Sequence, residues 1–269
     1  MKYIVNNKDI LLKEPKFNLS ETLDCGQAFR WSQIDDTSWH GYALNDYLEL
    51  KQLDEGILFK DTSEEFFLTR WVEYFDLNTN YELLKEMFSS TDITLKMACE
   101  YASGIRLLRQ DPWECLISFI ISQNNNIPRI KLIISRLCEH YNRFPTVEQM
   151  KDETIESIDY LKSGFRAKYI IDAVQKVYSK EVDLQKVSTM NIELARNELI
   201  KIKGVGAKVS ECVLLFGMHR TEAFPIDVWI KRVLKEYYPT GFPKSLYEYQ
   251  GIAQQFLFHY IRNLERSKQ

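Results

Sequence analysis

The sequence predicts an α+β protein, in which an N-terminal antiparallel β-sheet is followed by a mainly α-helical region. Residues 1–60 contain short aromatic or β-branched runs separated by turn-forming residues, a pattern typical of strands. From Ser63 onward, apolar residues recur at three- and four-residue intervals, the spacing of amphipathic helices. Strands first and helices afterwards indicate a segregated α+β architecture rather than an alternating one.

The strands are expected at residues 3–5, 9–12, 27–33, 38–44, 47–53 and 56–60. Most links between these runs are only a few residues long, and they contain turn-formers such as Asp35-Asp36 and Asn45-Asp46. Parallel strands need a crossover of a dozen or more residues, so links this short favour an antiparallel sheet.

Ser63, followed by two glutamates, opens the first expected helix. Further helices are expected at residues 81–88, 94–101, 112–122, 127–141, 146–151, 153–161, 166–178, 191–201, 207–217, 228–237 and 246–264. We therefore expect two domains. Residues 1–110 would form the sheet with its flanking helices, and residues 111–269 the helical region.

Composition and charge narrow the possible functions. The net charge of −3 means that DNA binding would depend on a local basic patch. No apolar run of about 18 residues and no basic-then-apolar start is present, so we expect neither a membrane span nor a signal peptide. The five cysteines are scattered, which favours a reducing, intracellular compartment. The four histidines are isolated in sequence, so we expect no metal site.

Residues 204–206, Gly-Val-Gly, lie between two expected helices and have Lys201, Lys203 and Lys208 around them. The first N–H groups of the second helix, together with the positive end of its dipole, would suit a phosphate. An ordinary helix–helix turn is the alternative. The basic flank favours a hairpin that binds DNA phosphate.

Two residues near this hairpin suit catalysis. Lys208 lies in the first turn of the second helix, beside an apolar stripe, where the dipole and partial burial disfavour a charged amine. A neutral lysine is a nucleophile. Asp227 follows Pro225 at the start of the next helix, where it would cap the helix and could also stabilise positive charge on a sugar. The alternatives are a solvated lysine and a cap alone.

Two other segments have residue types that suit DNA bases. Asn124 begins a triple Asn after an apolar helix, and Arg129 follows one turn later, so they would fill a gap in a duplex or form a capped loop. Gln254 and Phe258 share one helix face, where an amide and a ring could hold a flat heterocycle. A core Phe beside an exposed Gln is the alternative.

These motifs resemble the helix-hairpin-helix (Gly/Pro-Asp) superfamily of DNA glycosylases, and within it the 8-oxoguanine DNA glycosylases. The matching segments, in family order, are residues 24–31 (Asp-Cys-Gly-Gln-Ala-Phe-Arg-Trp), 114–127 with the triple Asn, 164–167 (Gly-Phe-Arg-Ala), 203–232 with the hairpin, and 251–258. Phe165 stands where the family usually has a tyrosine. The matches therefore run through most of the chain.

The resemblance implies a monomeric, bifunctional glycosylase and lyase that acts on duplex DNA containing 8-oxoguanine. Lys208 would attack the sugar C1′ and form a Schiff base with assistance from Asp227, and β-elimination would follow. The Gly26 carbonyl would accept the N7 hydrogen that distinguishes the oxidised base. The other implied contacts are Cys212, Gln254 and Phe258 with the flipped base, Asn124, Arg129, Phe165 and Arg166 with the duplex gap and opposite cytosine, and Gly204, Val205 and Gly206 with phosphate. The hairpin carbonyls would also suit a monovalent cation.

Two competing interpretations stay open: a related glycosylase for another damaged base, and a helix-hairpin-helix module that only binds DNA. Superfamily members with an iron–sulphur cluster carry four cysteines near their C-terminal end, whereas no cysteine follows Cys212 here, so we expect no cluster and no other cofactor. Members that use direct attack by water lack the lysine at position 208. A binding module needs the hairpin but neither Lys208 nor Asp227.

Overall fold

The structure is a computed structural model and describes residues 1–14 and 16–266. The chain divides into two compact units: unit 1 is Met1–Arg109 with Ile226–Gln269, and unit 2 is Gln110–Pro225. The chain therefore leaves unit 1 once and returns to it, whereas unit 2 is one continuous segment. The predicted α+β class is confirmed.

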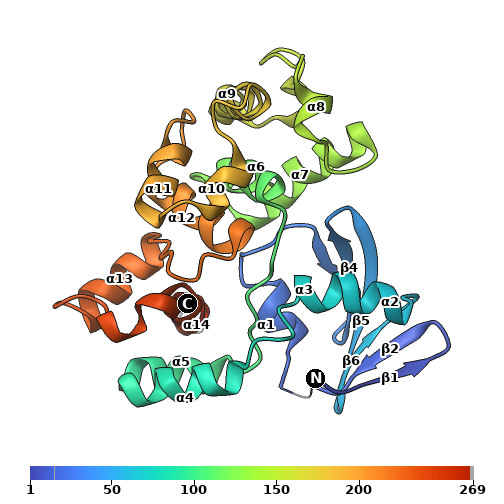
Figure 1. The fold of residues 1–269 in the computed structure, drawn as a ribbon, viewed down its shortest axis with the longest axis vertical. Helices are drawn as coiled ribbons and strands as arrows, with labels where there is room; N and C mark the ends of the chain where they lie inside the picture. The colour runs from blue at the N-terminus through green and yellow to red at the C-terminus, as the bar shows by residue number, and fades with distance from the viewer. Residues whose placement is uncertain (15, 267–269) are drawn as a thin grey trace. The chain divides into compact units, whose positions relative to one another are not determined.

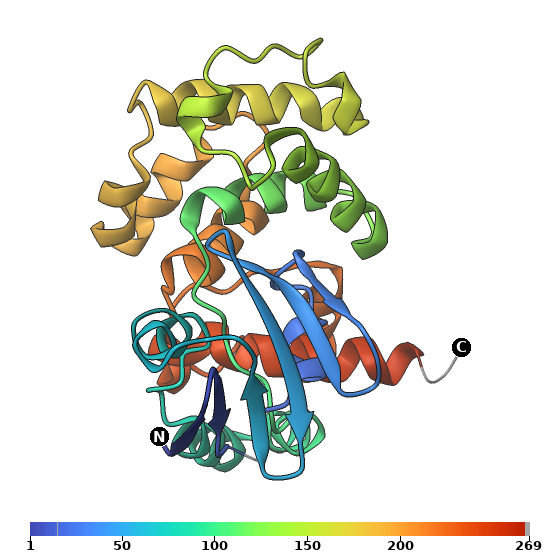
Figure 2. The same cartoon turned by 90° about the vertical axis from the view of Figure 1, so that its right-hand side faces the viewer.

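Unit 1 contains a six-stranded antiparallel sheet, as the sequence predicts. Its strands are β1 (Tyr3–Asn6), β2 (Asp9–Leu12), β3 (Trp31–Gln33), β4 (Ser38–Ala43), β5 (Asp46–Leu53) and β6 (Gly56–Phe59). They pair in the order β1-β2-β6-β5-β4-β3, so the long strands β4 and β5 lie inside the sheet (Figure 2). The β4–β5 hairpin turns at Leu44 and Asn45, whose φ values of 52° and 66° match the twist of the flanking strands.

The strand expected over residues 27–33 forms only at its end, as β3. Gln27 is fully buried, and its Nε2 donates to the carbonyls of Thr22 (2.9 Å) and Arg106 (2.8 Å). Its Oε1 accepts the N–H of Leu108 at 2.9 Å. The Gln27 side chain thus bonds backbone groups at Thr22 and at residues 106–108, and no local sequence pattern indicates these contacts.

Aromatic rings fill the space between the sheet and the helices that follow it. These helices are α2 (Glu64–Phe66) and α3 (Val72–Tyr74), joined by the π-helical turn Phe67–Trp71. Phe59 of β6 meets Phe67 and Phe75 edge-on, with ring centroids 5.1 and 5.5 Å away. All three rings are fully buried, and each contributes roughly 1.5–3 kcal/mol of burial free energy.

Other helices of unit 1 are α1 (Leu19–Leu23), α4 (Tyr81–Thr91), α5 (Ile93–Tyr101), α13 (Val228–Tyr237) and α14 (Gln250–Arg266). Helix α14 packs on α5 (Figure 1), and its buried Phe256 meets Phe88 of α4 with centroids 6.1 Å apart. The sequence assigned residues 226–269 to the helical region that follows residue 110. Packing groups them instead with the unit that contains the sheet, because the apolar face of α14 is covered by residues distant in sequence.

Unit 2 is built around α6 (Pro112–Ser122), whose residues 115–121 are all buried. Helices α7 (Ile127–Tyr141), α9 (Ala167–Tyr178) and α12 (Ala207–Cys212) pack against it (Figure 1). Helix α12 continues as the π-helical turn Val213–Gly217, and the unit also contains α8 (Val147–Met150), α10 (Leu184–Thr189) and α11 (Ile192–Ile200). An all-round apolar helix such as α6 is expected at the centre of a helical unit.

The prediction of a helix over residues 153–161 is wrong. Thr154 and Ser157 bond each other's backbone instead: the Thr154 N–H donates to Ser157 Oγ (2.8 Å), and the Ser157 N–H to Thr154 Oγ1 (3.2 Å). Such local bonds compete with helix formation, and only the 3₁₀ turn Asp159–Leu161 forms. Helices α1 and α10 were not predicted because each is a short helix of five or six residues. No helix in residues 1–14 and 16–266 has the length and apolarity needed to cross a membrane.

Candidate active site

The predicted Gly-Val-Gly hairpin joins α11 to α12 in unit 2. Gly204 has φ +83°, and a Cβ added there would lie 2.4 Å from the ring of Tyr169. Both the conformation and the close approach require glycine. At Gly206, an added Cβ would meet no atom within 4 Å. The backbone is therefore open to an approaching ligand at Gly206, whereas at Gly204 it packs against the protein.

Two N–H groups of the hairpin are used within the protein. The Lys203 N–H donates to Asp172 Oδ2 of α9 (2.6 Å), and the Val205 N–H donates to the Ile202 carbonyl (3.0 Å). The N–H groups in the first turn of α12, beginning at Ala207, have no acceptor inside that helix. These amides, rather than that of Val205, are the ones that the hairpin can offer to an anion.

The amine of Lys208 lies against helix α6. Its Nζ is 3.5 Å from Ser122 Oγ and 5.0 Å from the centre of the Phe119 ring. The Ser122 hydroxyl donates to the Phe119 carbonyl (2.8 Å), so its oxygen is left to accept from the amine. Neither contact is with a carboxylate, and the Lys208 side chain is half-buried. The sequence indicated Lys208 but neither of its neighbours, because they are almost ninety residues away in the chain.

Cys212 lies one turn after Lys208 and is buried. Its carbonyl is 3.7 Å from the thiol of Cys115 on α6. Burial raises the pKa of the Cys115 thiol well above its ordinary value. Two buried cysteine side chains, Cys115 and Cys212, therefore lie in this part of unit 2.

Arg166 holds the asparagine loop between α6 and α7 from inside. Its Nε donates to the Gln123 carbonyl (2.8 Å) and its Nη2 to the Asn124 carbonyl (2.7 Å). Its Nη1 donates to the Ser163 carbonyl (3.1 Å), and only 2% of the residue is exposed. We expected Arg166 at the opposite base, but in the structure it bonds backbone. The Asn124 side chain is exposed, on a residue with φ +46°.

Arg129 and Phe165 lie on the surface of unit 2. Phe165 is 48% exposed, with the Arg166 guanidinium 4.4 Å from its ring centre and the Tyr169 ring edge-on at 5.9 Å. Arg129 is exposed and donates from Nη2 to the Lys162 carbonyl at 3.5 Å. Burial and the charge of Arg129 lower the pKa of Arg166. The two arginines therefore share one small region next to the asparagine loop.

Gly26 lies in a bend after α1 with φ +80°. Helix α14 holds this bend: Gln255 Nε2 donates to the Cys25 carbonyl (3.2 Å), and Arg262 Nη1 donates to the Asp24 carbonyl (3.4 Å). Cys25 is buried, which raises its pKa to about 11. The carbonyls on the N-terminal side of Gly26 are thus fixed by residues more than two hundred positions away.

Gln254, next to Gln255 on α14, is 4% exposed, and its Oε1 has no hydrogen-bond partner among the residues that the structure describes. Leaving a buried acceptor unsatisfied costs roughly 1–3 kcal/mol, which a bound donor would recover. Phe258 follows one turn later and has the Arg262 guanidinium 5.8 Å from its ring centre. Helix α14 therefore supplies two of the predicted base contacts, Gln254 and Phe258, and also the anchors of the Gly26 bend.

Asp227 is the N-cap of α13, as the sequence predicts. Its Oδ1 accepts the N–H groups of Trp229 (3.0 Å) and Ile230 (2.8 Å). The cap fixes the direction of the carboxylate.

Among residues 1–14 and 16–266, no three His, Cys, Asp or Glu side chains gather where they could hold a metal ion.

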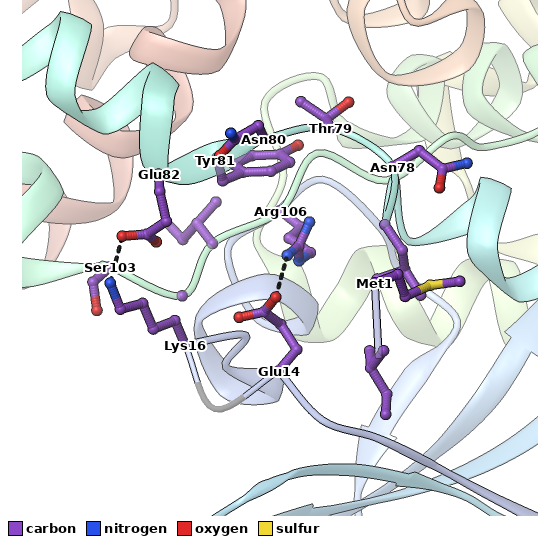
Figure 3. Close-up of a pocket in the computed structure, with 14 residues that line it drawn as sticks. Met1, Glu14, Lys16, Asn78, Thr79, Asn80, Tyr81, Glu82, Ser103 and Arg106 are labelled. Atoms are coloured by element: carbon purple, nitrogen blue, oxygen red, sulfur yellow. Dashed lines mark hydrogen bonds and ion pairs between the residues drawn. The ribbon is translucent and has the colours of Figure 1, made fainter. Parts of the chain in front are cut away.

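A pocket of about 280 Å³ lies elsewhere in unit 1 (Figure 3). Its charged residues are engaged with one another: Arg106 lies 3.8 Å from Glu14, and Lys16 lies 2.5 Å from Glu82. None of the site residues predicted from the sequence lines it. We therefore assign this pocket no part in the chemistry.

Comparison with known proteins identifies two family matches that together cover most of the chain. Residues 9–116 match the family described as "8-oxoguanine DNA glycosylase, N-terminal domain". Residues 117–246 match the "HhH-GPD superfamily base excision DNA repair protein" family. The junction between the two matches falls within α6.

Individual relatives agree with these matches. An 8-oxoguanine glycosylase/lyase of Clostridium acetobutylicum, solved with double-stranded DNA containing cytosine opposite 8-oxoG, is 33% identical, with a TM-score of 0.90 over 98% of this chain and 99% of that one. The structure of MBOgg1 with a low-affinity DNA ligand is 37% identical, with a TM-score of 0.91 over 98% and 100%. The N-glycosylase/DNA lyase of Saccharomyces cerevisiae is 30% identical over 88% of this chain and 72% of the yeast protein.

Proposed function

The chain belongs to the 8-oxoguanine DNA glycosylase family, and from this premise we propose that it is a bifunctional base-excision repair enzyme. It excises 8-oxoguanine from double-stranded DNA as an N-glycosylase and then cleaves the strand as a lyase. The observation that carries this proposal is the position of the Lys208 amine just after the hairpin. The amine contacts the Ser122 hydroxyl and the Phe119 ring, and neither of these partners is a carboxylate. A module that only binds DNA has no use for an amine held in this way.

The proposed chemistry begins with attack of the neutral Lys208 amine on the sugar C1′. The new C1′–N bond forms as the bond to the base breaks, and the base leaves with the electron pair and takes up a proton. Opening of the C1′–O4′ bond then gives the imine. The imine makes the C2′ hydrogen acidic, so its removal expels the 3′-phosphate by β-elimination. Asp227 stabilises the positive charge that develops on the sugar.

Recognition of the base is assigned to Gly26, Gln254, Phe258 and Cys212. The Gly26 carbonyl accepts the N7 hydrogen of 8-oxoguanine, whereas guanine presents an acceptor at N7 and is rejected. Gln254 bonds the pairing edge, and its unsatisfied Oε1 supports this assignment. Cys212 and Phe258 sandwich the flipped base. Extrusion of the base costs a few kcal/mol, which these contacts offset.

The rest of the duplex contacts unit 2. Gly204, Val205 and Gly206 form the phosphate-binding hairpin, with the amides that open α12 as donors. Asn124 fills the gap left by the base, and Phe165 wedges beside it. Arg129 and Arg166 read the opposite cytosine, and Arg166 must first release its backbone carbonyls to do so. Arg129 is exposed and needs no such exchange.

We propose that the reaction needs no cofactor, because a lysine supplies the nucleophile directly. A monovalent cation on the hairpin carbonyls is compatible with the turn and would help to attract phosphate. We also propose an intracellular location, because the substrate is DNA.

Borohydride trapping on duplex DNA containing 8-oxoguanine tests the proposal. Wild-type protein should give a covalent adduct, and Lys208→Gln should give none while it retains DNA binding. Lys203→Gln is the matched control, since it removes an exposed lysine from the same hairpin and should still be trapped. Absence of a wild-type adduct, or an unchanged adduct with Lys208→Gln, would overturn the proposal. Excision of an alkylated base without any adduct would indicate a glycosylase of another class.

A further inference from the structure

We infer that Asp172 of α9 is a positioning residue for DNA binding, because its carboxylate fixes the Gly-Val-Gly hairpin in the shape that receives phosphate. The inference rests on the proposed function, in which this hairpin binds DNA phosphate. Asp172 touches no DNA in that assignment. It acts on the hairpin through contacts that all lie within unit 2.

The Asp172 carboxylate accepts a backbone N–H from the segment that enters the hairpin. Its Oδ2 lies 2.6 Å from the backbone nitrogen of Lys203, which is 31 positions away in the chain. Lys176, one turn later on α9, has its Nζ 3.3 Å from the same oxygen and also donates to the Lys201 carbonyl. Two side chains of α9 therefore hold both a donor and an acceptor of this segment.

The same face of α9 packs against the turn itself. Tyr169 precedes the aspartate by three residues, so the two side chains are neighbours on the helix surface. A Cβ added at Gly204 would lie 2.4 Å from the Tyr169 ring. The Val205 N–H is bonded within the turn. Residues 201–205 are thus held from one side, and Gly206 is the first residue of the hairpin that is open to a ligand.

An acidic residue in this place opposes phosphate binding through its charge. A carboxylate repels phosphate, and the lysines of the hairpin would attract DNA more strongly without it. Asp172 and Lys176 could pair on the surface of α9 as an ordinary i,i+4 ion pair, with no contact to the hairpin. The bond to the Lys203 N–H goes beyond such a pair. Control of the hairpin geometry is therefore the better account of this carboxylate.

The experiment compares two substitutions whose effects on charge are the same. Asp172→Ala removes the acceptor, whereas Asp172→Asn removes the charge but keeps an oxygen that can accept the Lys203 N–H. Each is combined with Lys208→Gln, so that the base is not excised while the Kd for duplex DNA containing 8-oxoguanine is measured at fixed salt. We expect Asp172→Ala to raise the Kd roughly fivefold or more over Lys208→Gln alone, and Asp172→Asn to stay within about twofold. Charge alone predicts tighter binding in both variants.

Asp183→Ala is the matched control. The Asp183 carboxylate also accepts backbone N–H groups in unit 2, but these belong to the first turn of α10 rather than to the hairpin. In the same Lys208→Gln background, it should lose comparable stability in urea unfolding and leave the Kd within about twofold. Alanine is the best helix former, so α9 should persist in Asp172→Ala. If that variant is unfolded, Asp172→Leu replaces it, with the same expected loss of affinity.

The outcomes separate this inference from the proposed function. If wild-type protein gives no borohydride adduct, the proposed function fails. If wild-type protein is trapped and Asp172→Ala binds DNA as tightly as its reference or more tightly, the inference alone fails. An equal loss of affinity in Asp172→Asn or in Asp183→Ala also overturns it. With Lys208 present and DNA saturating, Asp172→Ala should still be trapped, and loss of the adduct there would contradict a role confined to binding.

Discussion

The amine of Lys208 lies over the face of the Phe119 ring, 5.0 Å from its centre. For the protonated amine such a cation–π contact is worth roughly 0.5–2 kcal/mol, and the amine gives up its proton before it attacks. The contact holds a flexible four-carbon side chain in one direction before any substrate is bound. Phe119 comes from the central helix α6, whose residues 115–121 are all buried, so the proposed nucleophile is held by a well-packed helix.

Phe119→Leu should therefore slow excision without loss of DNA affinity. We expect the single-turnover rate to fall by about tenfold, which corresponds to about 1.4 kcal/mol of lost alignment. Phe216→Leu is the control, because Phe216 stacks on Phe119 at 5.4 Å but has no assigned contact with the amine. Both variants should lose comparable stability in thermal unfolding. Equal loss of rate in the two would contradict a role for the ring.

The two hairpin glycines should respond differently to alanine. Gly204→Ala places a Cβ 2.4 Å from the Tyr169 ring at φ +83°, and should cost roughly 1–3 kcal/mol of unfolding free energy. Gly206→Ala meets no atom within 4 Å and should leave stability nearly unchanged. It should still weaken DNA binding several-fold if phosphate approaches the backbone there. Urea unfolding and a DNA titration at fixed salt measure both effects, and wild-type affinity in Gly206→Ala would argue against the hairpin contact.

Gln254→Leu should make the protein more stable and less active. Its Oε1 is buried without a partner among the described residues, so removing it should gain roughly 1 kcal/mol of unfolding free energy. Excision of 8-oxoguanine should fall by tenfold or more. Gln255→Leu is the matched control, since it breaks the bond to the Cys25 carbonyl and should lower stability. A stabilised Gln254→Leu with full activity would remove Gln254 from the base site.

The buried thiol of Cys25 should make stability depend on alkaline pH. Its pKa is raised by burial from 9.0 to about 11, so the folded state holds the proton more tightly than the unfolded state does. This contribution is complete below pH 9 and is lost as the pH rises to about 11, by an amount on the order of 2 kcal/mol. Urea unfolding at pH 8 and at pH 10.5 should show a smaller decrease for Cys25→Ala than for wild type. Equal decreases would contradict the assignment.

Local signals in the sequence were enough to predict most of the helices. The bounds of α6, α7 and α13 agree with those predicted, and each begins at a side-chain cap: Asp111, Asn126 and Asp227 all accept a backbone N–H. A cap and the helix that it starts are only a few residues apart, so the pattern is visible in one short window. The helix expected over residues 153–161 failed for a related reason, since local side-chain bonds at Thr154 and Ser157 compete with the helix.

The sequence by itself determined the antiparallel sheet, the Gly-Val-Gly hairpin, the place of Lys208 in the first turn of the next helix, and the capping role of Asp227. All of these depend on residues close together in the chain. Only the tertiary structure decided that Phe119 and Ser122 hold the amine, that Gln255 fixes the bend at Gly26, and that Arg166 bonds the asparagine loop from inside. These contacts join residues 42 to 230 positions apart. Their partners are set by how helices pack, and packing depends on the whole apolar surface rather than on any local pattern.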